Sequence, residues 1–322
     1  MRSRVLITGG TGFVGRNLLD RMLGFPQEWD VTIASRSTPA WLSELNHVVW
    51  DVASDQLPTV EVDVVVHAAT PASAAMNVSS PASMFDQIVS GAKGVINFCR
   101  KQSKPPVLLF TSSGAVYGEM PRDLHRWDEA SSLAVDPLDV RSAYAEGKRA
   151  AELLISIAGR EGLCRPIIAR LFAFSGPHLP LDRHFAIGNF VRQAAAGETI
   201  VVTGDGSAIR SYLDGRDMAA WLTNCIGRSE QVRSQPLHIG SENPITVASL
   251  AALVAQRAES VLGRSIAVRV EGAKRSTDGV SRYLPGTART RELLGVEERI
   301  GLSDSVDEML RLAANPPSRL TS

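Results

Sequence analysis

The chain has 322 residues, of which 44% are hydrophobic and 21% are charged, and its 34 basic residues balance 34 acidic ones. This composition is typical of a globular protein with a sizeable core, and the zero net charge argues against a nucleic-acid-binding or membrane-surface protein. Three widely spaced cysteines in apolar segments predict buried free thiols and no metal site. Because we recognise neither a signal peptide nor a run of about 18 apolar residues, we expect a cytoplasmic protein.

Apolar, strand-like runs alternate with longer helical patterns in the first half of the chain. The predicted strands cover 4–9, 30–35, 47–52, 62–69, 106–113 and 166–174. Helical spacing is found over 14–23, 83–101 and 143–159. The strand runs are rich in β-branched residues and nearly continuous, as in parallel strands that are buried on both faces. This alternation predicts an α/β fold with a Rossmann-type, doubly wound parallel sheet.

The chain changes character at Pro177, where a proline-rich loop interrupts the alternation. Later helices and strands are predicted over 185–197, 199–204, 246–263, 265–272 and 303–315. We expect a dinucleotide-binding domain over 1–176, to which 210–242 returns. A smaller C-terminal α/β substrate-binding domain is expected mainly over 177–322.

A glycine-rich segment, ITGGTGFVGR, joins the first predicted strand to the first predicted helix. Glycines allow a tight turn and a close approach of the backbone to a pyrophosphate, and a helix N-terminus offers N–H groups and a positive dipole end. Strand, loop and helix follow one another as this fingerprint requires. We therefore predict that a dinucleotide cofactor contacts Gly9, Gly12, Phe13, Val14 and Gly15.

The end of the second predicted strand indicates which dinucleotide is bound. The fingerprint expects a carboxylate there for the adenosine ribose 2′-hydroxyl, but the chain has Ser35 and Arg36. Arg36 would pair with a 2′-phosphate, which favours NADP(H) and leaves NAD(H) possible; an exposed surface arginine is the alternative. Asp51 and Val52, at the end of the third predicted strand, would lie beside the adenine, although Asp51 could instead cap a turn or a helix.

The segment SAYAEGKR places Tyr144 and Lys148 four residues apart, so both side chains share one face of a predicted helix. Alone, this spacing also fits an ordinary amphipathic helix. Two further motifs accompany it, TGGTGFVG at the first strand and TSSGAVYG after the fifth. With them, the chain resembles the extended short-chain dehydrogenase/reductase family, specifically its nucleotide-sugar epimerase, dehydratase and reductase group, over nearly its whole length.

The resemblance implies that Ser113, Tyr144 and Lys148 are catalytic. Tyr144 would be the general acid or base, although a phenol with a pKa near 10 exchanges protons poorly at neutral pH. The Lys148 ammonium and an oxidised nicotinamide would lower that pKa, and Lys148 would also bind the nicotinamide ribose. Ser113 would hold the substrate oxygen, whereas Ser112 would point elsewhere because side chains alternate along a strand.

The same resemblance implies further contacts with the cofactor and the substrate. The cofactor would also meet Ala68, Ala69, Thr70, Tyr144, Lys148 and Leu171. The substrate would meet Ser113, Tyr144 and Asn189. Arg210, in GDGSAIR, would bind a nucleotide diphosphate, with a surface ion pair as the alternative.

The two residues after Ser113 narrow the chemistry. Related sugar 4,6-dehydratases carry Asp-Glu after the catalytic hydroxyl, and related decarboxylases carry Glu in the same segment, whereas this chain has Gly114 and Ala115. Neither side chain can transfer a proton, so we expect neither dehydration nor decarboxylation. Hydride transfer at a carbinol or a ketone remains.

The leading hypothesis is an NADP(H)-dependent reductase of a nucleotide-linked keto-sugar, such as a 4-keto-6-deoxy sugar. A nucleotide-sugar 4-epimerase with tightly bound NAD is the main alternative. A reductase of small non-sugar ketones and a non-catalytic dinucleotide sensor are the others. Relatives commonly dimerise through the two long helices that flank the fifth strand, so we expect a homodimer through 83–101 and 144–159.

Overall fold

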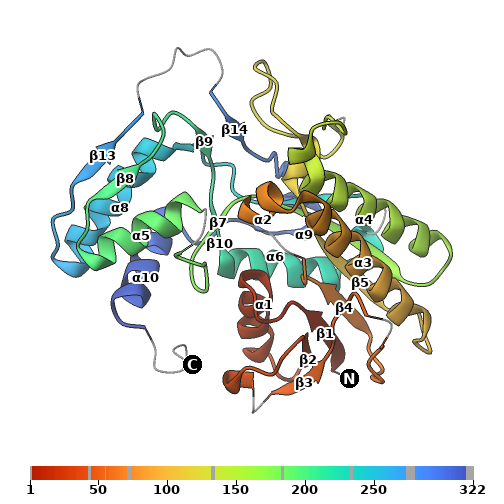
Figure 1. Cartoon of the computed structure of the whole chain (residues 1–322). Coiled ribbons are helices and arrows are strands. Elements are labelled where there is room, and N and C mark those ends of the chain that lie inside the picture. The colour runs from red at the N-terminus through yellow and green to blue at the C-terminus, as the bar shows by residue number, and fades with distance from the viewer. Residues whose placement is uncertain are drawn as a thin grey trace.

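A seven-stranded sheet forms the centre of the protein in the computed structural model (Figure 1). The strand order is β11–β6–β5–β4–β1–β2–β3, and every neighbouring pair runs parallel. This confirms the predicted Rossmann-type, doubly wound sheet. The structure describes residues 2–42, 45–54, 56–70, 74–131, 135–182, 185–232, 235–272 and 280–316.

Burial explains where the strands of this sheet form. They are β1 (Ser3–Thr8), β2 (Trp29–Ser35), β3 (Asn46–Val49), β4 (Val64–His67), β5 (Val107–Ser113), β6 (Arg165–Leu171) and β11 (Leu237–Ile239). Strands β4 and β5 are buried along their whole length, which accounts for their nearly unbroken apolar runs. Strand β3 lies at the sheet edge and ends at Val49, so the predicted strand over 47–52 was too long.

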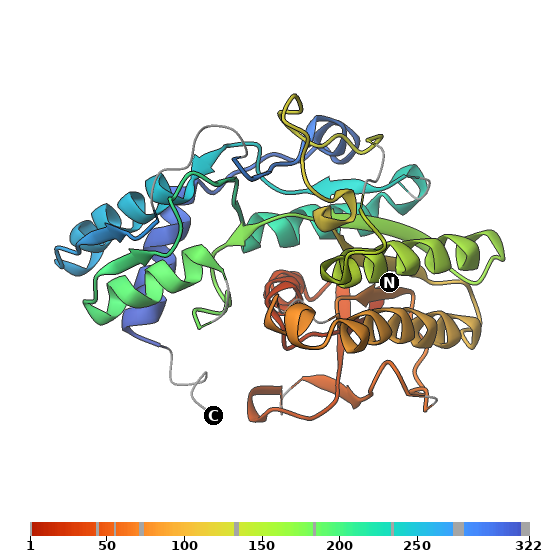
Figure 2. The same cartoon turned by 45° about the horizontal axis from the view of Figure 1, so that its top comes forward.

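Helices cover both faces of the sheet, as Figures 1 and 2 show. One face packs against α1 (Phe13–Leu23) and α6 (Gly215–Gly227), and the other against α3 (Pro81–Arg100) and α4 (Ala143–Arg160). Through α6 and β11, the segment 210–242 returns to the sheet. These contacts support its proposed place in the dinucleotide-binding domain.

A second group of elements has its own apolar core and lies to the left in Figure 1. Its members are α5 (Ala186–Ala196), β8 (Ile200–Val202), α8 (Val247–Leu262), β13 (Val268–Val270) and α10 (Leu302–Ala314). Strands β8 and β13 pair in parallel. We propose that this group is the main part of the substrate-binding domain.

Short elements complete the two groups and the segments between them, and most were not predicted. They are α2 (Ala74–Ser79), β7 (Phe174–Ser175), β9 (Ile209–Arg210), β10 (Leu213–Asp214), α7 (Ser229–Val232), β12 (Ile245–Thr246), β14 (Arg282–Tyr283), α9 (Ala288–Leu294) and the 3-10 turns Ala40–Leu42, Gly114–Tyr117 and Val140–Ser142. The predicted strand over 166–174 is two strands, because β6 ends at Leu171 and β7 pairs with β10 instead. Strand β14 pairs with β9 and carries Tyr283 towards β5.

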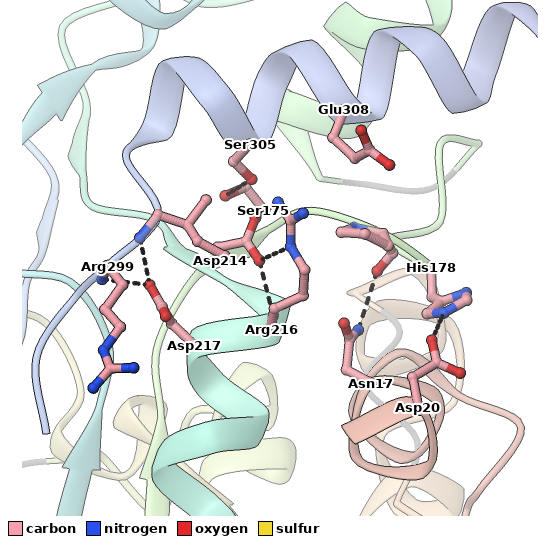
Figure 3. Close-up of polar contacts among 12 residues, drawn as sticks. Asn17, Asp20, Ser175, His178, Asp214, Arg216, Asp217, Arg299, Ser305 and Glu308 are labelled. Atoms are coloured by element: carbon pink, nitrogen blue, oxygen red, sulfur yellow. Dashed lines mark hydrogen bonds and ion pairs between the residues drawn. The ribbon is translucent and has the colours of Figure 1, made fainter. Parts of the chain in front are cut away.

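The chain crosses from one group to the other beside α1, at Pro177 and His178. Figure 3 shows His178 next to Asp20 of that helix. Asn17 Nδ2 donates to the Pro177 carbonyl over 3.0 Å, and His178 Nε2 lies 2.7 Å from Asp20 Oδ2. His178 has φ +67°, and it is the only non-glycine residue in the described stretches with positive φ. The crossing is therefore fixed to the helix that begins at the glycine loop.

Within the described stretches, no helix is long and apolar enough to cross a membrane. No group of three or more His, Cys, Asp or Glu residues in those stretches is placed to hold a metal ion. Cys99, Cys164 and Cys225 are buried and free, as predicted.

Candidate active site

The glycine loop has no room for side chains at two of the predicted positions. Gly9 adopts φ +73°, and a Cβ on it would lie 2.6 Å from the backbone of Ala68. A Cβ on Gly15 would lie 2.4 Å from the Gly9 carbonyl oxygen. Glycine is therefore required at both positions, and the loop between β1 and α1 closes tightly.

The start of α1 fits the pyrophosphate of a dinucleotide. The N-cap is Gly12, which has no side chain to cap the helix, and the first turn contains no acidic residue. The helix begins at Phe13, one residue before the predicted start at Val14, and both residues are half-buried. Their backbone N–H groups and the positive end of the helix dipole suit an anion.

The predicted adenosine end of the site lies beyond β2 and β3. Arg36 is exposed, and no carboxylate of the described residues forms an ion pair with it. The Ser35 hydroxyl lies 2.9 Å from His47 Nε2, so it is engaged within the protein. Asp51 lies beyond the end of β3, not within it, and its carboxylate closes a turn, while Val52 is half-buried. Contacts of these residues with a cofactor stay predictions.

A second arginine, Arg16 on α1, was missed in the sequence analysis. The Arg16 guanidinium, on the first turn of α1, lies 4.4 Å from the centre of the Trp41 ring. It is half-buried, and burial lowers the pKa of Arg16, opposed by the charge of Asp20. Its position directly after the third glycine was the available signal.

Lys148 is the most deeply buried of the predicted catalytic residues, with 1% of its surface exposed. Its Nζ donates to Thr70 Oγ1 and to the Thr111 carbonyl, each over 2.6 Å, and lies 4.8 Å from the centre of the Phe110 ring. Burial lowers the pKa of Lys148 to about 7, although the Glu152 carboxylate acts in the opposite direction. An ammonium has three donors, so one remains for a ligand.

Ser113 and Tyr144 meet at the carboxyl end of β5. Burial raises the pKa of Tyr144, and interaction with the Ser113 hydroxyl lowers it. The Ser113 Oγ accepts a bond from the Ala115 N–H over 3.1 Å, which fixes the serine at the start of the 3-10 turn. The structure thus brings three predicted catalytic residues and Thr70 to one place.

Tyr283 also reaches this place, and it was not predicted from the sequence. Its hydroxyl lies 3.4 Å from Ser113 Oγ and 3.4 Å from the carbonyl oxygen of Leu171. Its ring packs on Phe172 with centres 4.9 Å apart. Burial raises the pKa of Tyr283 far above its ordinary range, so this phenol stays protonated. It therefore forms a neutral wall beside Ser113.

Asn77, on the short helix α2, is a second residue that the sequence did not reveal. Helix α4 has no side-chain cap of its own at Ser142. Instead, Asn77 Oδ1 accepts a bond from the Tyr144 N–H over 3.0 Å, and Asn77 Nδ2 donates to the Arg141 carbonyl over 2.8 Å. The amide thus holds the first turn of the helix that carries Tyr144.

Of the predicted substrate residues outside the catalytic set, Arg210 lies beside Tyr283, on the paired strand β9. Arg210 donates to the carbonyl and hydroxyl of Ser281, and it lies close enough to Tyr283 to influence its pKa. Burial lowers the pKa of Arg210, and no carboxylate of the described residues pairs with it. Asn189 is half-buried on α5, and no contact within the described stretches joins it to the catalytic residues.

Comparison with known proteins decides the family. Residues 5–240 match the model of the NAD dependent epimerase/dehydratase family. The chain belongs to that family. Among curated relatives, UDP-glucuronic acid decarboxylase 3 of Arabidopsis thaliana is 28% identical over 98% of this chain and 91% of the relative. UDP-glucuronic acid decarboxylase 1 of Danio rerio is 26% identical over 96% of this chain and 72% of the relative.

Solved structures of the epimerase/dehydratase type share the fold. An epimerase from Methanothermobacter thermautotrophicus superimposes with a TM-score of 0.81 at 22% identity, over 96% of this chain and 91% of the other. UDP-glucose 4-epimerase of Thermotoga maritima, solved with UDP-glucose, superimposes with a TM-score of 0.81 at 19% identity. The match covers 96% of this chain and 97% of the other. The predicted family and fold are confirmed, and the chain is an enzyme of the NAD dependent epimerase/dehydratase family.

Proposed function

We propose that this enzyme reduces a nucleotide-linked keto-sugar, such as a 4-keto-6-deoxy sugar, with NADPH. The observation that carries the proposal is the lack of a proton-transferring side chain after Ser113. A Cβ on Gly114 would lie 2.6 Å from the Phe172 ring and 2.8 Å from the Tyr283 hydroxyl, so the position admits no carboxylate. Ala115 carries only a methyl group. Dehydration and decarboxylation need additional acid–base groups, which this segment does not supply.

The catalytic residues fit proton transfer to a carbonyl oxygen. A reduced nicotinamide supplies the hydride when it is bound. Ser113 holds the carbonyl oxygen, and the Tyr144 phenol gives its proton to that oxygen, which leaves a phenolate. The Lys148 ammonium stabilises the phenolate as it forms, and Thr70 and the Thr111 carbonyl keep the ammonium in place.

The preference for NADP(H) rests on two arginines. Arg36 is exposed, and Arg16 is half-buried against Trp41, and no described carboxylate forms an ion pair with either. A 2′-phosphate would give both guanidinium groups a directly paired anion. NAD(H) lacks this phosphate, so we expect it to bind more weakly.

Arg210 supports a substrate that carries a diphosphate. A half-buried arginine without a described carboxylate partner suits phosphate oxygens, because the planar guanidinium forms paired hydrogen bonds. A small non-sugar ketone would leave this charge without a partner. Asn189 is proposed as a further substrate contact.

The alternative is a nucleotide-sugar 4-epimerase with tightly bound NAD. The family match favours it, because the family is described as NAD dependent and named for epimerases. The same Ser113, Tyr144 and Lys148 would serve both reactions. The two proposals differ in whether the cofactor dissociates and in whether the sugar leaves reduced.

The first experiment is to denature the purified protein and identify any released nucleotide. An empty protein that binds NADPH at least tenfold more tightly than NADH supports the reductase. Near-stoichiometric NAD⁺ supports the epimerase and overturns the roles of Arg16 and Arg36. A screen of nucleotide-linked keto-sugars with NADPH follows, in which Tyr144→Phe should lower kcat by about 10²–10⁴ and leave cofactor affinity unchanged.

We further propose that the enzyme is a cytoplasmic homodimer formed through α3 and α4. Leu153 and Ile157 on α4 are 63% and 44% exposed. A groove beside Leu153 is lined by Phe85 and by polar side chains of α4 such as Glu146 and Arg149. A second copy would cover these apolar side chains. Light scattering should give twice the 34.6 kDa chain mass, and Leu153→Glu should give the monomer mass.

A further inference from the structure

A buried network of hydrogen bonds lies behind the catalytic residues, and Glu152 is at its centre. Tyr144, Lys148 and Glu152 follow one another at four-residue intervals along α4, so they share the face that packs on the sheet. The Glu152 side chain is only 12% exposed.

The Glu152 carboxylate is fully engaged by two strands. It accepts bonds from Arg170 Nε over 3.0 Å and Nη2 over 2.7 Å, and from Ser112 Oγ over 2.5 Å. Burial lowers the pKa of Arg170, but the bonds and charge of Glu152 outweigh that effect. A buried ion pair of this kind is maintained only when its remaining donors and acceptors are satisfied.

The network holds the catalytic corner on both sides of Ser113. Before Ser113, the bond from Ser112 ties the end of β5 to Glu152. After it, Arg170 Nη1 donates to the Tyr117 hydroxyl over 2.7 Å, and that hydroxyl lies 2.6 Å from His238 Nε2. The strand end and the 3-10 turn that follows are thus fixed to one ion pair.

The charge of Glu152 also reaches Lys148. Burial lowers the pKa of Lys148, and the Glu152 carboxylate raises it. The other titratable groups that face Lys148 are Tyr144 on the same helix and His67 on β4. Burial and the Lys148 charge lower the pKa of His67 to about 3, so this imidazole is neutral at physiological pH.

We infer that Glu152 is a positioning residue of the reaction, which favours the cationic form of Lys148 beside Tyr144 and holds the β5 corner that carries Ser113. The inference rests on the proposed roles of Tyr144 and Lys148. Without the carboxylate, Lys148 loses its proton at lower pH, and the Tyr144 phenolate loses its counter-charge. Arg170 and Ser112 act through Glu152 and touch no reacting atom.

The test is a direct titration of Tyr144 that needs no substrate. The chain has four tyrosines, and burial raises the pKa of Tyr117 and Tyr212 to about 12 and that of Tyr283 further. Tyrosinate absorbance is followed from pH 6 to 10 with saturating oxidised cofactor. The difference between the wild type and Tyr144→Phe isolates the titration of Tyr144.

Glu152→Gln, measured against its own Tyr144→Phe partner, should raise the apparent pKa of Tyr144 by about one unit. Glu146→Gln is the matched control, because it removes the same charge from the surface side of α4, where Glu146 pairs with Arg149. This control should shift the apparent pKa of Tyr144 by less than about 0.2 pH units. Ser112→Ala keeps the charge, so it should leave the pKa in place and lower kcat severalfold.

Two outcomes would overturn the inference: an unchanged Tyr144 titration in Glu152→Gln, whatever the loss of stability, or a wild-type Tyr144 that does not titrate below pH 10. If Glu152→Gln does not fold, the double variant Glu152→Gln/Arg170→Gln removes both buried charges, and the same shift is expected from it. Failure to reduce any keto-sugar would refute the proposed function and leave this titration standing.

Discussion

Lys148 is needed for activity, but its burial should lower the free energy of unfolding of the protein. Its pKa falls from 10.5 to about 7 on folding because the ammonium is buried. At about 1.36 kcal/mol per unit, this shift costs roughly 4 kcal/mol of folding free energy at pH 7. Lys148→Met removes that cost and leaves the Thr111 carbonyl and the Thr70 hydroxyl without the lysine, which costs about 1–3 kcal/mol. The variant should therefore be inactive and more stable by about 1–3 kcal/mol.

The pH dependence gives this prediction a second test. Between pH 7 and 10.5 the unfolded chain holds a proton on Lys148 that the folded protein has released, so wild-type stability rises with pH across this window. Lys148→Met lacks that rise, so its advantage should vanish near pH 10. Urea unfolding followed by tryptophan fluorescence at pH 7 and 10 measures both midpoints, with an expected shift of about 0.3–1 M at pH 7.

The control is Lys93→Met, the same substitution at an exposed lysine on α3. It should leave the midpoint unchanged within about 0.5 kcal/mol at both pH values. A Lys148→Met protein that is less stable than the wild type at pH 7, with a difference that does not vary with pH, would refute the reasoning. The ammonium would then be stabilised in the fold.

The remaining predictions concern residues around the site. Asn77→Ala should lower kcat about tenfold with unchanged cofactor affinity, because the Tyr144 N–H loses its acceptor; Asn77→Asp keeps the acceptor and should retain more activity in the same assay. The free energy of unfolding of His178→Gly should exceed that of His178→Ala by about 1 kcal/mol, seen as a higher melting temperature. Both variants lose the bond to Asp20, but only glycine adopts the positive φ without strain. Burial lowers the pKa of His238 to about 4, so stability falls by roughly 2–3 kcal/mol as the pH drops from 6.5 to 4. His238→Gln should flatten that loss in urea midpoints, and an equal loss in both proteins would contradict it.

The parallel sheet could be predicted because its signal is local. The runs that form β4 and β5 are rich in apolar, β-branched residues. Because both faces of these strands are buried, apolar and polar residues do not alternate along them. The short strands β7, β9 and β14 could not be predicted, because two residues carry no period. Their positions follow from tertiary pairing, which no window of sequence records.

The same distinction applies to the site. The pairing of Tyr144 and Lys148 could be predicted because both lie on one helix at a spacing of four residues. Glu152 lies one turn further along the same helix face, so the sequence could also have indicated its place beside Lys148. Tyr283 and Asn77 could not be predicted as site residues. Tyr283 is 170 residues from Ser113 along the chain, and Asn77 is 67 residues from Tyr144, so no local pattern links them. Asp51 was assigned to a strand end that forms a turn, because an edge strand offers little burial to extend it.

The order of charges behind the site explains how a buried lysine can serve catalysis. A lone buried ammonium loses its proton, and a carboxylate beside it would be costly in turn unless it had a partner. Arg170 is that partner of Glu152. From the sheet to the cofactor side, the charges of Arg170, Glu152 and Lys148 are therefore positive, negative and positive, and the positive charge of Lys148 remains uncompensated. When Tyr144 gives up its proton, the phenolate neutralises that charge. The network is therefore better satisfied after proton transfer than before it, which is the differential stabilisation that lowers a barrier.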